Sequence, residues 1–330
     1  AVSSSLPDPL LRVDNLVRRY GGITATDHLS MEVVPGELHA IIGPNGAGKT
    51  TLISQLTGQV MPNSGTIHFA GRDVTGLPSY KRSRLGLARS LQLTSLLKDF
   101  SAIDNVALAA QAHAGTSFRF FANARKEKGL REAAHAALER VGLPQEFGER
   151  YPHQLSGGQK QRVVIARALT LKPKLIVCDE VVAALDMSIR GDVLNLFADL
   201  QRDLGLTYVF ITHDLAVVSH ISERVAVMYL GQFVELGPTE EVAERPLHPY
   251  TIALLSAEPR PLPSSMRQDS RIVLQGEVPS PIDPPSGCRF RTRCPHAQPL
   301  CTERVPEWRE LKPDHWVACH FADRPSFSPN

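Results

Sequence analysis

The sequence predicts an α/β protein in which a mostly parallel β-sheet carries helices on both faces. The apolar run "ELHAIIG" is typical of a buried strand, and the helical pattern "GKTTLISQLTG" follows it directly. Two further β-rich apolar runs, "KPKLIVCDE" and "LTYVFITHD", are each preceded by a helical pattern. Strands that alternate with helices favour a parallel sheet, because each crossover places a helix against a face of the sheet.

The composition changes toward the end of the chain and indicates two parts. Residues 100–142 are rich in alanine and have high helix propensity, in line with the α/β part. From about residue 246 the chain is rich in proline, as in "GEVPSPIDPPSGC", and proline at that density excludes long helices. We therefore expect a large domain over residues 1–245 and a small, irregular, cysteine-rich extension over residues 246–330.

The overall composition excludes several classes of protein. A hydrophobic share of 42% and a charged share of 21% are typical of a soluble globular protein. The net charge of +2 provides no basic field, so we expect no nucleic-acid partner. No apolar run reaches the roughly 18 residues of a membrane span, and the start "AVSSSLPDPL" lacks the pattern of a secretion signal. We therefore expect a cytoplasmic protein that reaches a membrane only through partners.

The stretch "GPNGAGKTT" has the pattern of a phosphate-binding loop. It matches G-x-x-x-x-G-K-[ST] and lies between an expected strand and an expected helix, the context that this pattern requires. Glycines let the backbone amides curl toward an anion, and the amino end of the helix adds partial positive charge. Lys49 is expected to reach the terminal phosphates of a nucleotide, and Thr50 to offer its hydroxyl to Mg²⁺. The expected nucleotide-binding residues of the loop are Gly43, Pro44, Asn45, Gly46, Ala47, Gly48, Lys49, Thr50 and Thr51.

Two consecutive acids end the apolar run "KLIVCDE". Asp179 is expected to bind Mg²⁺, and Glu180 to polarise a water molecule for attack on phosphate. The alternative is a helix cap after a strand, a role that aspartate often fills. A phosphate loop alone fits a kinase, a GTPase, a motor or a transporter ATPase, so the class of protein depends on a second motif.

That second motif is "LSGGQKQR", which opens the helical pattern "QRVVIARALTL". Ser156, Gly157 and Gly158 would begin this helix with free amides and a hydroxyl, which makes a second anion site. One compact domain is not expected to bring two such distant sites onto one phosphate. A head-to-tail dimer resolves this, because the second site of each chain then closes on the nucleotide of the other.

Together, these motifs resemble the ATP-binding subunits of ABC transporters, over nearly the whole chain. The resemblance implies ATP hydrolysis in a P-loop ABC ATPase fold, with a mixed sheet and a helical subdomain at about residues 93–170. The family's motifs correspond to the phosphate loop, to the signature at residues 155–159, and to the carboxylates Asp179 and Glu180. The signature residues assigned to the nucleotide site are Ser156, Gly157, Gly158 and Gln159.

The resemblance also assigns roles to residues that carry little signal alone. Tyr20 in "RRYGG" looks like the aromatic residue that stacks on adenine, and Gln92 in "RSLQLTS" like the glutamine that joins the magnesium site to the membrane partner. His213 in "ITHD" looks like the histidine that contacts the γ-phosphate, and Asp186 ends the "ALD" loop that links the two sites of the dimer. Taken singly, Tyr20 would more often be a packing residue and His213 a capped strand-end residue.

Two positions depart from the family's pattern. Val181 stands where proline usually follows the glutamate, and Ala183 where a serine often precedes "ALD". Proline would fix the backbone after the base, whereas valine leaves it freer and adds an N–H group. The expected catalytic atoms are all present, so we expect hydrolysis, and these two positions bear on its rate.

The two halves of the chain resemble different importer subfamilies. Residues 11–143 look like the ATPases of branched-chain amino acid importers, whereas residues 150–325, with "HPYTIALLSAEP", look like those of oligopeptide and dipeptide importers. We give more weight to the second resemblance because its tail is the more unusual module. The expected function is therefore ATP-driven import of peptides, and the alternatives are an importer of branched-chain amino acids or other small solutes, or a soluble ABC ATPase.

The peptide-importer resemblance implies a set of partners. We expect two transmembrane permease subunits, a second and different ABC ATPase subunit, and an extracytoplasmic substrate-binding protein. The chain would then lie at the cytoplasmic face of the cell membrane, held there by the permease subunits.

Four cysteines of the tail, Cys288, Cys294, Cys301 and Cys319, have the spacing C-x5-C-x6-C-x17-C. In a reducing compartment such a cluster suggests a metal or cofactor rather than disulfides. Zinc sites usually have closer pairs, whereas widely spaced thiolates suit a [4Fe-4S] cluster. The peptide-importer resemblance implies such a cluster at these positions, and a zinc ion or ordinary reduced cysteines are the alternatives.

Overall fold

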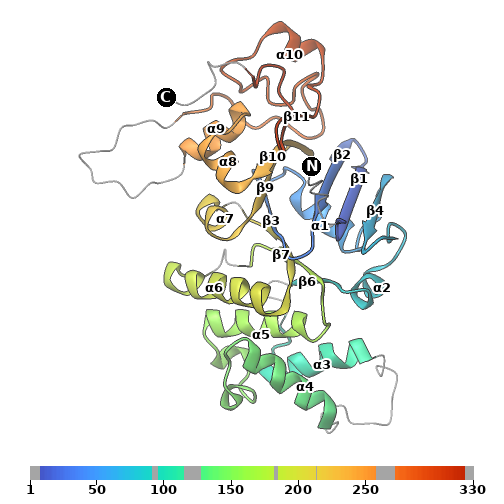
Figure 1. Cartoon of the computed structure of the whole chain (residues 1–330), viewed down its shortest axis with the longest axis vertical. Helices are drawn as coiled ribbons and strands as arrows, with labels where there is room; N and C mark the ends of the chain where they lie inside the picture. The colour runs from blue at the N-terminus through green and yellow to red at the C-terminus, as the bar shows by residue number, and fades with distance from the viewer. Residues whose placement is uncertain are drawn as a thin grey trace, which may run out of the picture.

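The computed structural model describes residues 8–90, 96–114, 128–181, 185–212, 214–257 and 272–323. These residues form two β-sheets with helices packed around them (Figure 1). The first sheet is antiparallel and has the strand order β2-β1-β4-β5. Its strands are β1 (Leu11–Tyr20), β2 (Ile23–Val33), β4 (Ser64–Phe69) and β5 (Arg72–Asp73).

The second sheet has the order β11-β12-β10-β9-β3-β8-β7-β6 and is parallel at its centre. There β3 pairs with β8 and β9, and β7 pairs with β8 and β6, all in parallel. Antiparallel pairing of β9, β10, β12 and β11 extends the sheet on one side, so it is a mixed sheet. Its strands are β3 (Leu38–Ile42), β6 (Leu87–Ser90), β7 (Leu175–Asp179), β8 (Thr207–Ile211), β9 (Arg224–Tyr229), β10 (Gln232–Pro238), β11 (Arg309–Lys312) and β12 (His315–Val317).

Helices connect these strands, as the alternating sequence pattern predicts. The α-helices are α1 (Lys49–Leu56), α2 (Ser79–Arg84), α3 (Ala102–Ala114), α4 (Lys128–Arg140), α5 (Gly157–Leu169), α6 (Met187–Leu204), α7 (Leu215–Ile221), α8 (Thr239–Glu244), α9 (Pro249–Ser256) and α10 (Pro299–Glu303). In the part of the chain that the structure describes, none of them has both the length and the apolar character needed to cross a membrane.

The central strands are buried on both faces, and their side chains alternate between two cores. Ile176 and Phe210 lie in the core that contains α5 and α6, whereas Val177 and Val209 lie in the core that contains α1 and the antiparallel sheet. Strands covered on both faces carry uninterrupted apolar runs, which is why β7 and β8 can be recognised in the sequence. Cys178 points into the first of these cores, and burial raises the pKa of its thiol well above the ordinary value.

The helices α3, α4 and α5 pack against one another and form a separate lobe (Figure 1). This lobe lies at the end of the molecule opposite α10 and β11 (Figure 1). Alanine side chains let the helices approach closely, and Ala134 and Ala137 of α4 are buried there. These helices lie within the expected helical subdomain at about residues 93–170, which stays a prediction.

The part of the chain expected to form an irregular extension contains α9, α10, β11 and β12, so it is less irregular than its proline content predicts. Strand β12 hydrogen-bonds to β10, so this part continues the main sheet. The junction contains a fully buried pair, in which His315 Nε2 lies 2.8 Å from Glu235 Oε1. The backbone amides of Leu247 and His248 donate to the same carboxylate, at 2.7 and 2.9 Å. A buried charge needs such partners, so we infer that this junction is fixed.

Candidate nucleotide-binding site

The phosphate loop lies between β3 and α1, where the sequence places it. Gly48 has a φ of 103° and precedes α1, and a Cβ atom at this position would lie 2.0 Å from the carbonyl oxygen of Ala25. At Gly43, a Cβ atom would lie 2.2 Å from the carbonyl oxygen of Met228. Both positions therefore require glycine, because the loop is pressed against β2 and β9.

Arg82 fixes the far end of α1. Its guanidinium is fully buried and donates to the carbonyl oxygens of Gln55 and Leu56, at 2.7 and 2.8 Å. A cation at the carboxyl end of a helix satisfies its last carbonyl groups and opposes the helix dipole. This burial lowers the pKa of Arg82 to about 10, so the side chain stays charged at neutral pH. Arg82 thus fixes the carboxyl end of α1, while the amino end of this helix faces the phosphate loop.

Lys49 lies at the start of α1 with its ammonium group inside the loop. Its Nζ atom donates to the carbonyl oxygens of Gly43 and Pro44, at 2.6 and 2.9 Å. Burial lowers the pKa of Lys49, and the nearby carboxylates of Glu180 and Asp179 oppose that effect. A buried cation interacts more strongly with phosphate than an exposed one, because water screens it less.

Asp179 ends β7 and is held by an arginine that sequence reasoning missed. Arg89 of the neighbouring strand β6 donates from Nη2 to Asp179 Oδ2 at 2.9 Å, and its Nη1 atom binds the side chain of Gln59. The side chains of Arg89 and Asp179 are 19% and 8% exposed, so this ion pair is largely shielded from water. A metal ion that binds Asp179 therefore has to share this carboxylate with Arg89 or displace Arg89 from it. The contact follows from the pairing of β6 with β7, and no sequence motif predicts that pairing.

Glu180 follows Asp179 in an unusual backbone conformation. Its φ is 48°, in the left-handed region that residues other than glycine seldom adopt. Its amide donates to the carbonyl oxygen of Ile211 at 3.0 Å, which ties it to the end of β8. Local strain of this kind persists where the surrounding structure fixes it, and it often marks a functional position. Val181, which replaces the expected proline, is buried in the core that contains α5 and α6.

The signature motif begins α5 with a reciprocal pair of hydrogen bonds. Ser156 Oγ accepts from the amide of Gln159 at 3.3 Å, and Gln159 Oε1 accepts from the amide of Ser156 at 2.9 Å. A Cβ atom at Gly158 would lie 2.6 Å from Cγ2 of Ile189 on α6, so glycine is needed for the two helices to meet. Figure 1 shows α5 in the helical lobe, apart from α1 beside the antiparallel sheet. The two expected anion sites thus lie in different parts of one chain.

Of the remaining expected site residues, Tyr20 and Asp186 lie in the part of the chain that the structure describes. Tyr20 ends β1 with 43% of its surface exposed, and the guanidinium carbon of Arg18 lies 4.6 Å from its ring centroid. Asp186 is exposed and directly precedes α6. Gln92 and His213 lie outside the described residues, as does the start of the "ALD" loop, so their predicted roles stay predictions.

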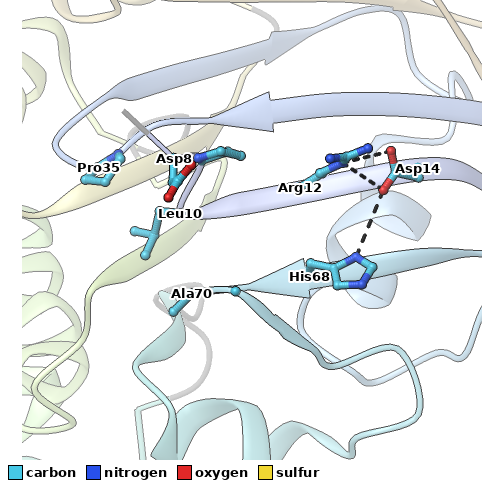
Figure 2. A pocket seen from close by; sticks show the side chains of 9 residues that line it. Asp8, Leu10, Arg12, Asp14, Pro35, His68 and Ala70 are labelled. Carbon is cyan, nitrogen blue, oxygen red and sulfur yellow. Dashed lines mark hydrogen bonds and ion pairs between the residues drawn. The ribbon is translucent and has the colours of Figure 1, made fainter. Parts of the chain in front are cut away.

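A pocket of about 660 Å³ lies beside the antiparallel sheet and is lined in part by residues of β1 and β4 (Figure 2). Three of its polar side chains lie close together. Arg12 donates to Asp14 at 3.0 Å, and His68 Nδ1 lies 4.0 Å from the same carboxylate. No residue of the phosphate loop lines it, so we do not assign the nucleotide to this pocket.

The four tail cysteines meet although they are distant in the sequence. Cys288, Cys294, Cys301 and Cys319 line one small cavity, together with Phe290 and Phe321. Burial and the neighbouring thiols raise the pKa of Cys288 to about 12 and that of Cys294 to about 11. Over the described ranges, no group of three or more His, Cys, Asp or Glu side chains is arranged to hold a metal ion. The thiols thus face a common space, without the arrangement of an ion site.

Comparisons with known proteins agree with these motifs. Residues 26–183 match the family "ABC transporter", and residues 234–301 match the family "Oligopeptide/dipeptide transporter, C-terminal region". The oligopeptide transport ATP-binding protein AppF of Bacillus subtilis is 44% identical over 304 residues, which are 92% of this chain and 91% of the relative.

Solved structures show the same fold. MJ1267, an ATP-binding cassette of an ABC transporter, has a TM-score of 0.67 and 30% identity, and the match covers 74% of this chain and 98% of that one. The dimeric bacterial cassette MJ0796 has a TM-score of 0.60 and 26% identity, over 69% of this chain and 98% of that one. With its phosphate loop, its signature motif and these relatives, the chain belongs to the ATP-binding proteins of ABC transporters and is an ABC-type ATPase.

Proposed function

We propose that this protein hydrolyses ATP to power the import of peptides through partner membrane subunits. The main support for this proposal is that one chain combines an ABC phosphate loop and signature with a C-terminal region of the oligopeptide/dipeptide transporter type. The likeness to AppF spans 92% of the chain, so it includes the half that resembles branched-chain amino acid importers. That breadth favours peptides over branched-chain amino acids as the solute.

Each expected site residue has a specific role in the proposed hydrolysis. Lys49 and the loop amides bind the β- and γ-phosphates, and Glu180 orients and polarises the attacking water. Thr50 and Asp179 would supply the hard oxygen ligands that Mg²⁺ prefers. Asp179 would then either bind Mg²⁺ and Arg89 together or lose its contact with Arg89. Bound Mg²⁺ would neutralise charge on the phosphates. Gln92 and His213 would complete the magnesium site and stabilise the developing charge.

The signature helix would act on the nucleotide of another subunit. Ser156, Gly157, Gly158 and Gln159 begin α5 in a lobe separate from α1, so a head-to-tail partner brings them to the phosphate of the opposite loop. The dimeric cassette MJ0796 gives a precedent for a pair of cassettes. Asp186 would link the two sites. We propose a second, different ATPase chain as the partner, two permease subunits, and an extracytoplasmic binding protein, with the complex at the cytoplasmic face of the membrane.

The domain division accompanies this proposal. Residues 1–245 would form the nucleotide-binding domain, with the helical subdomain at about residues 93–170 as the part that faces the permease. Residues 246–330 would form the extension that is typical of peptide importers. The buried pair of Glu235 and His315 supports a fixed attachment of this extension to the main sheet.

We also propose a [4Fe-4S] cluster at the four tail cysteines. Their thiols line one enclosed cavity, and an iron cluster needs one cysteine per iron atom at a wider separation than a single ion requires. Burial raises the pKa of the Cys288, Cys294 and Cys319 thiols, so these groups need a positive partner to exist as thiolates, and iron would supply that charge. The wide sequence spacing of the four cysteines favours such a cluster over one zinc ion. The cluster would fix the fold of the extension.

Anaerobic purification is expected to give brown protein with about four irons and matching sulfide per chain. Cys301→Ser should reduce the iron content, because it removes one ligand of the set. Cys178→Ala is the matched control, since Cys178 lies in β7 within the core, and it should keep the iron. Iron and sulfide analysis with visible absorption measures the outcome, and colourless protein with stoichiometric zinc would contradict the cluster.

The proposed function is tested by purifying the chain together with permease subunits of a peptide importer from the same organism. We expect a stable complex whose ATPase rate rises when a peptide-loaded binding protein is added. Stimulation by branched-chain amino acids and not by peptides would favour the alternative importer class. Failure to associate with any membrane subunit would favour a soluble ABC ATPase.

A further inference from the structure

Arg289 connects the cysteine-bearing segment, residues 288–319, to the core of the ATPase. It directly follows Cys288, and its guanidinium donates to the carbonyl oxygen of Leu230 and to the carboxylate of Asp27. The side chains of Arg289 and Asp27 are only 13% and 15% exposed. An ion pair shielded from water in this way is stronger than one on the surface, and breaking it leaves a buried charge without a partner.

Leu230 belongs to a strained two-residue turn that joins β9 to β10. The strands pair up to Tyr229 and Gln232, and the two residues between them have φ values of 45° for Leu230 and 82° for Gly231. Two positive φ values are typical of a type I′ hairpin turn, where asparagine or glycine is preferred. Leucine is unfavourable in this conformation, so the contacts around the turn must hold it there.

The same turn binds the phosphate loop. The amide of Gly231 donates to the carbonyl oxygen of Ala47 at 2.7 Å, and the carbonyl oxygen of Gly231 accepts from the amide of Asp27 at 2.8 Å. Ala47 lies between Gly46 and Gly48 in the loop. A shift of the turn would therefore move the backbone amides that are expected to face the phosphates.

Asp27 forms the second link between Arg289 and the loop. Its carboxylate also accepts from Gln232 Nε2 at 3.1 Å, just after the turn. Two residues earlier on β2, the carbonyl oxygen of Ala25 lies only 2.0 Å from the position that a Cβ atom of Gly48 would take, so β2 packs directly against the loop. Arg289 thus holds together two elements that contact the loop, the β9–β10 turn and β2.

Phe290 anchors the segment independently of Arg289. Its ring is 1% exposed and packs at 5.4 Å from the ring centroids of both Tyr229 and Tyr250. Cys288 and Cys294 pack against the same core cluster. The segment can therefore stay docked when the Arg289 contacts are removed, which lets a substitution test the contacts alone.

We propose that Arg289 is a positioning residue of the nucleotide site, which fixes the phosphate loop through Leu230 and Asp27 and so couples the cysteine-bearing segment to ATP affinity. The inference rests on the assignment of the loop to ATP, made under the proposed function. Arg289 touches no reacting atom, so its removal should weaken the binding of ground state and transition state alike.

The test is a set of variants of the full chain, measured for ATP binding with a fluorescent ATP analogue and for steady-state hydrolysis. Arg289→Gln is expected to raise Kd and KM by about tenfold with kcat within about twofold. Arg304→Gln is the matched control, because Arg304 is an exposed arginine of the same segment, and it should bind as the native chain does. Hydrogen exchange of the loop amides should be faster in Arg289→Gln and unchanged in Arg304→Gln.

The variant Asp27→Asn tests the same contact from the other side. Because Asp27 and Arg289 act through each other, the double variant should bind ATP no more weakly than Arg289→Gln alone. Native affinity in both single variants, or additive losses in the double variant, would overturn the inference. If Arg289→Gln does not fold, Asp27→Asn decides the question alone by the same Kd measurement. Absence of ATP binding in the native chain would instead count against the proposed function.

Discussion

Replacing Lys49 with alanine is expected to reduce ATP binding and hydrolysis by at least about a hundredfold. Lys49 is 7% exposed, and its ammonium group lies between the carbonyl oxygens of the loop and the carboxylates that end β7. Its removal leaves the loop without a buried cation at the position where the γ-phosphate charge is expected. Equilibrium binding of a fluorescent ATP analogue and phosphate release measure the two losses.

Lys81→Ala serves as the control for this change. Lys81 is an exposed lysine of α2, so its removal makes the same change of charge at a distance from the loop. It should bind and hydrolyse ATP at the native level. If Lys49→Ala hydrolysed ATP within a few-fold of the native rate, the loop would not be the catalytic nucleotide site.

Replacing Glu180 with glutamine is expected to slow turnover by about a hundredfold or more, with ATP affinity nearly unchanged. The glutamine side chain has the same shape but is not a base, so nucleotide still binds while water is no longer polarised. ATP should then hold the ATPase subunits together for longer. Phosphate release measures the rate, and light scattering with and without ATP measures the association.

Glu240→Gln is the matched control for this variant, because Glu240 is exposed in the first turn of α8. Native turnover is expected there. Unchanged turnover in Glu180→Gln would remove Glu180 as the base. Loss of ATP binding in Glu180→Gln would instead indicate that the strained backbone at this residue is needed for the shape of the site.

The sequence predicts the parts of the fold that local patterns specify. The continuous apolar runs of β7 and β8 identify central strands, because both faces are buried there. Residues 10–75 contain the antiparallel sheet, which the general α/β pattern does not reveal, since those strands pair with one another and not with the central ones. Likewise, β12 is short and follows a proline-rich region, and its pairing with β10 and β11 makes it a strand.

The same division holds for the site. Lys49, Asp179 and Ser156 belong to motifs in which residue type and spacing carry the chemistry, so they can be recognised from the sequence alone. Arg89 and Arg289 cannot, because their roles depend on partners that are far away in the chain. Arg89 reaches Asp179 across a strand pair, and Arg289 reaches Asp27 from the other end of the chain. An arginine outside a recognisable motif gives no such signal until the fold shows its partner.

Arg89 connects two parts of the candidate site. It pairs with Asp179 and also binds the side chain of Gln59, which follows α1. It therefore links the expected magnesium ligand to the helix that begins at Lys49.

The most direct test of the peptide-import account is uptake into proteoliposomes that contain the complete transporter. The complex of this chain, its partner ATPase and the permease subunits is supplied with the binding protein, ATP and labelled peptides. The account predicts ATP-dependent peptide accumulation that is abolished by Glu180→Gln in this chain and unaffected by Glu240→Gln. Accumulation of branched-chain amino acids without peptides, or peptide uptake that does not depend on ATP, would contradict it.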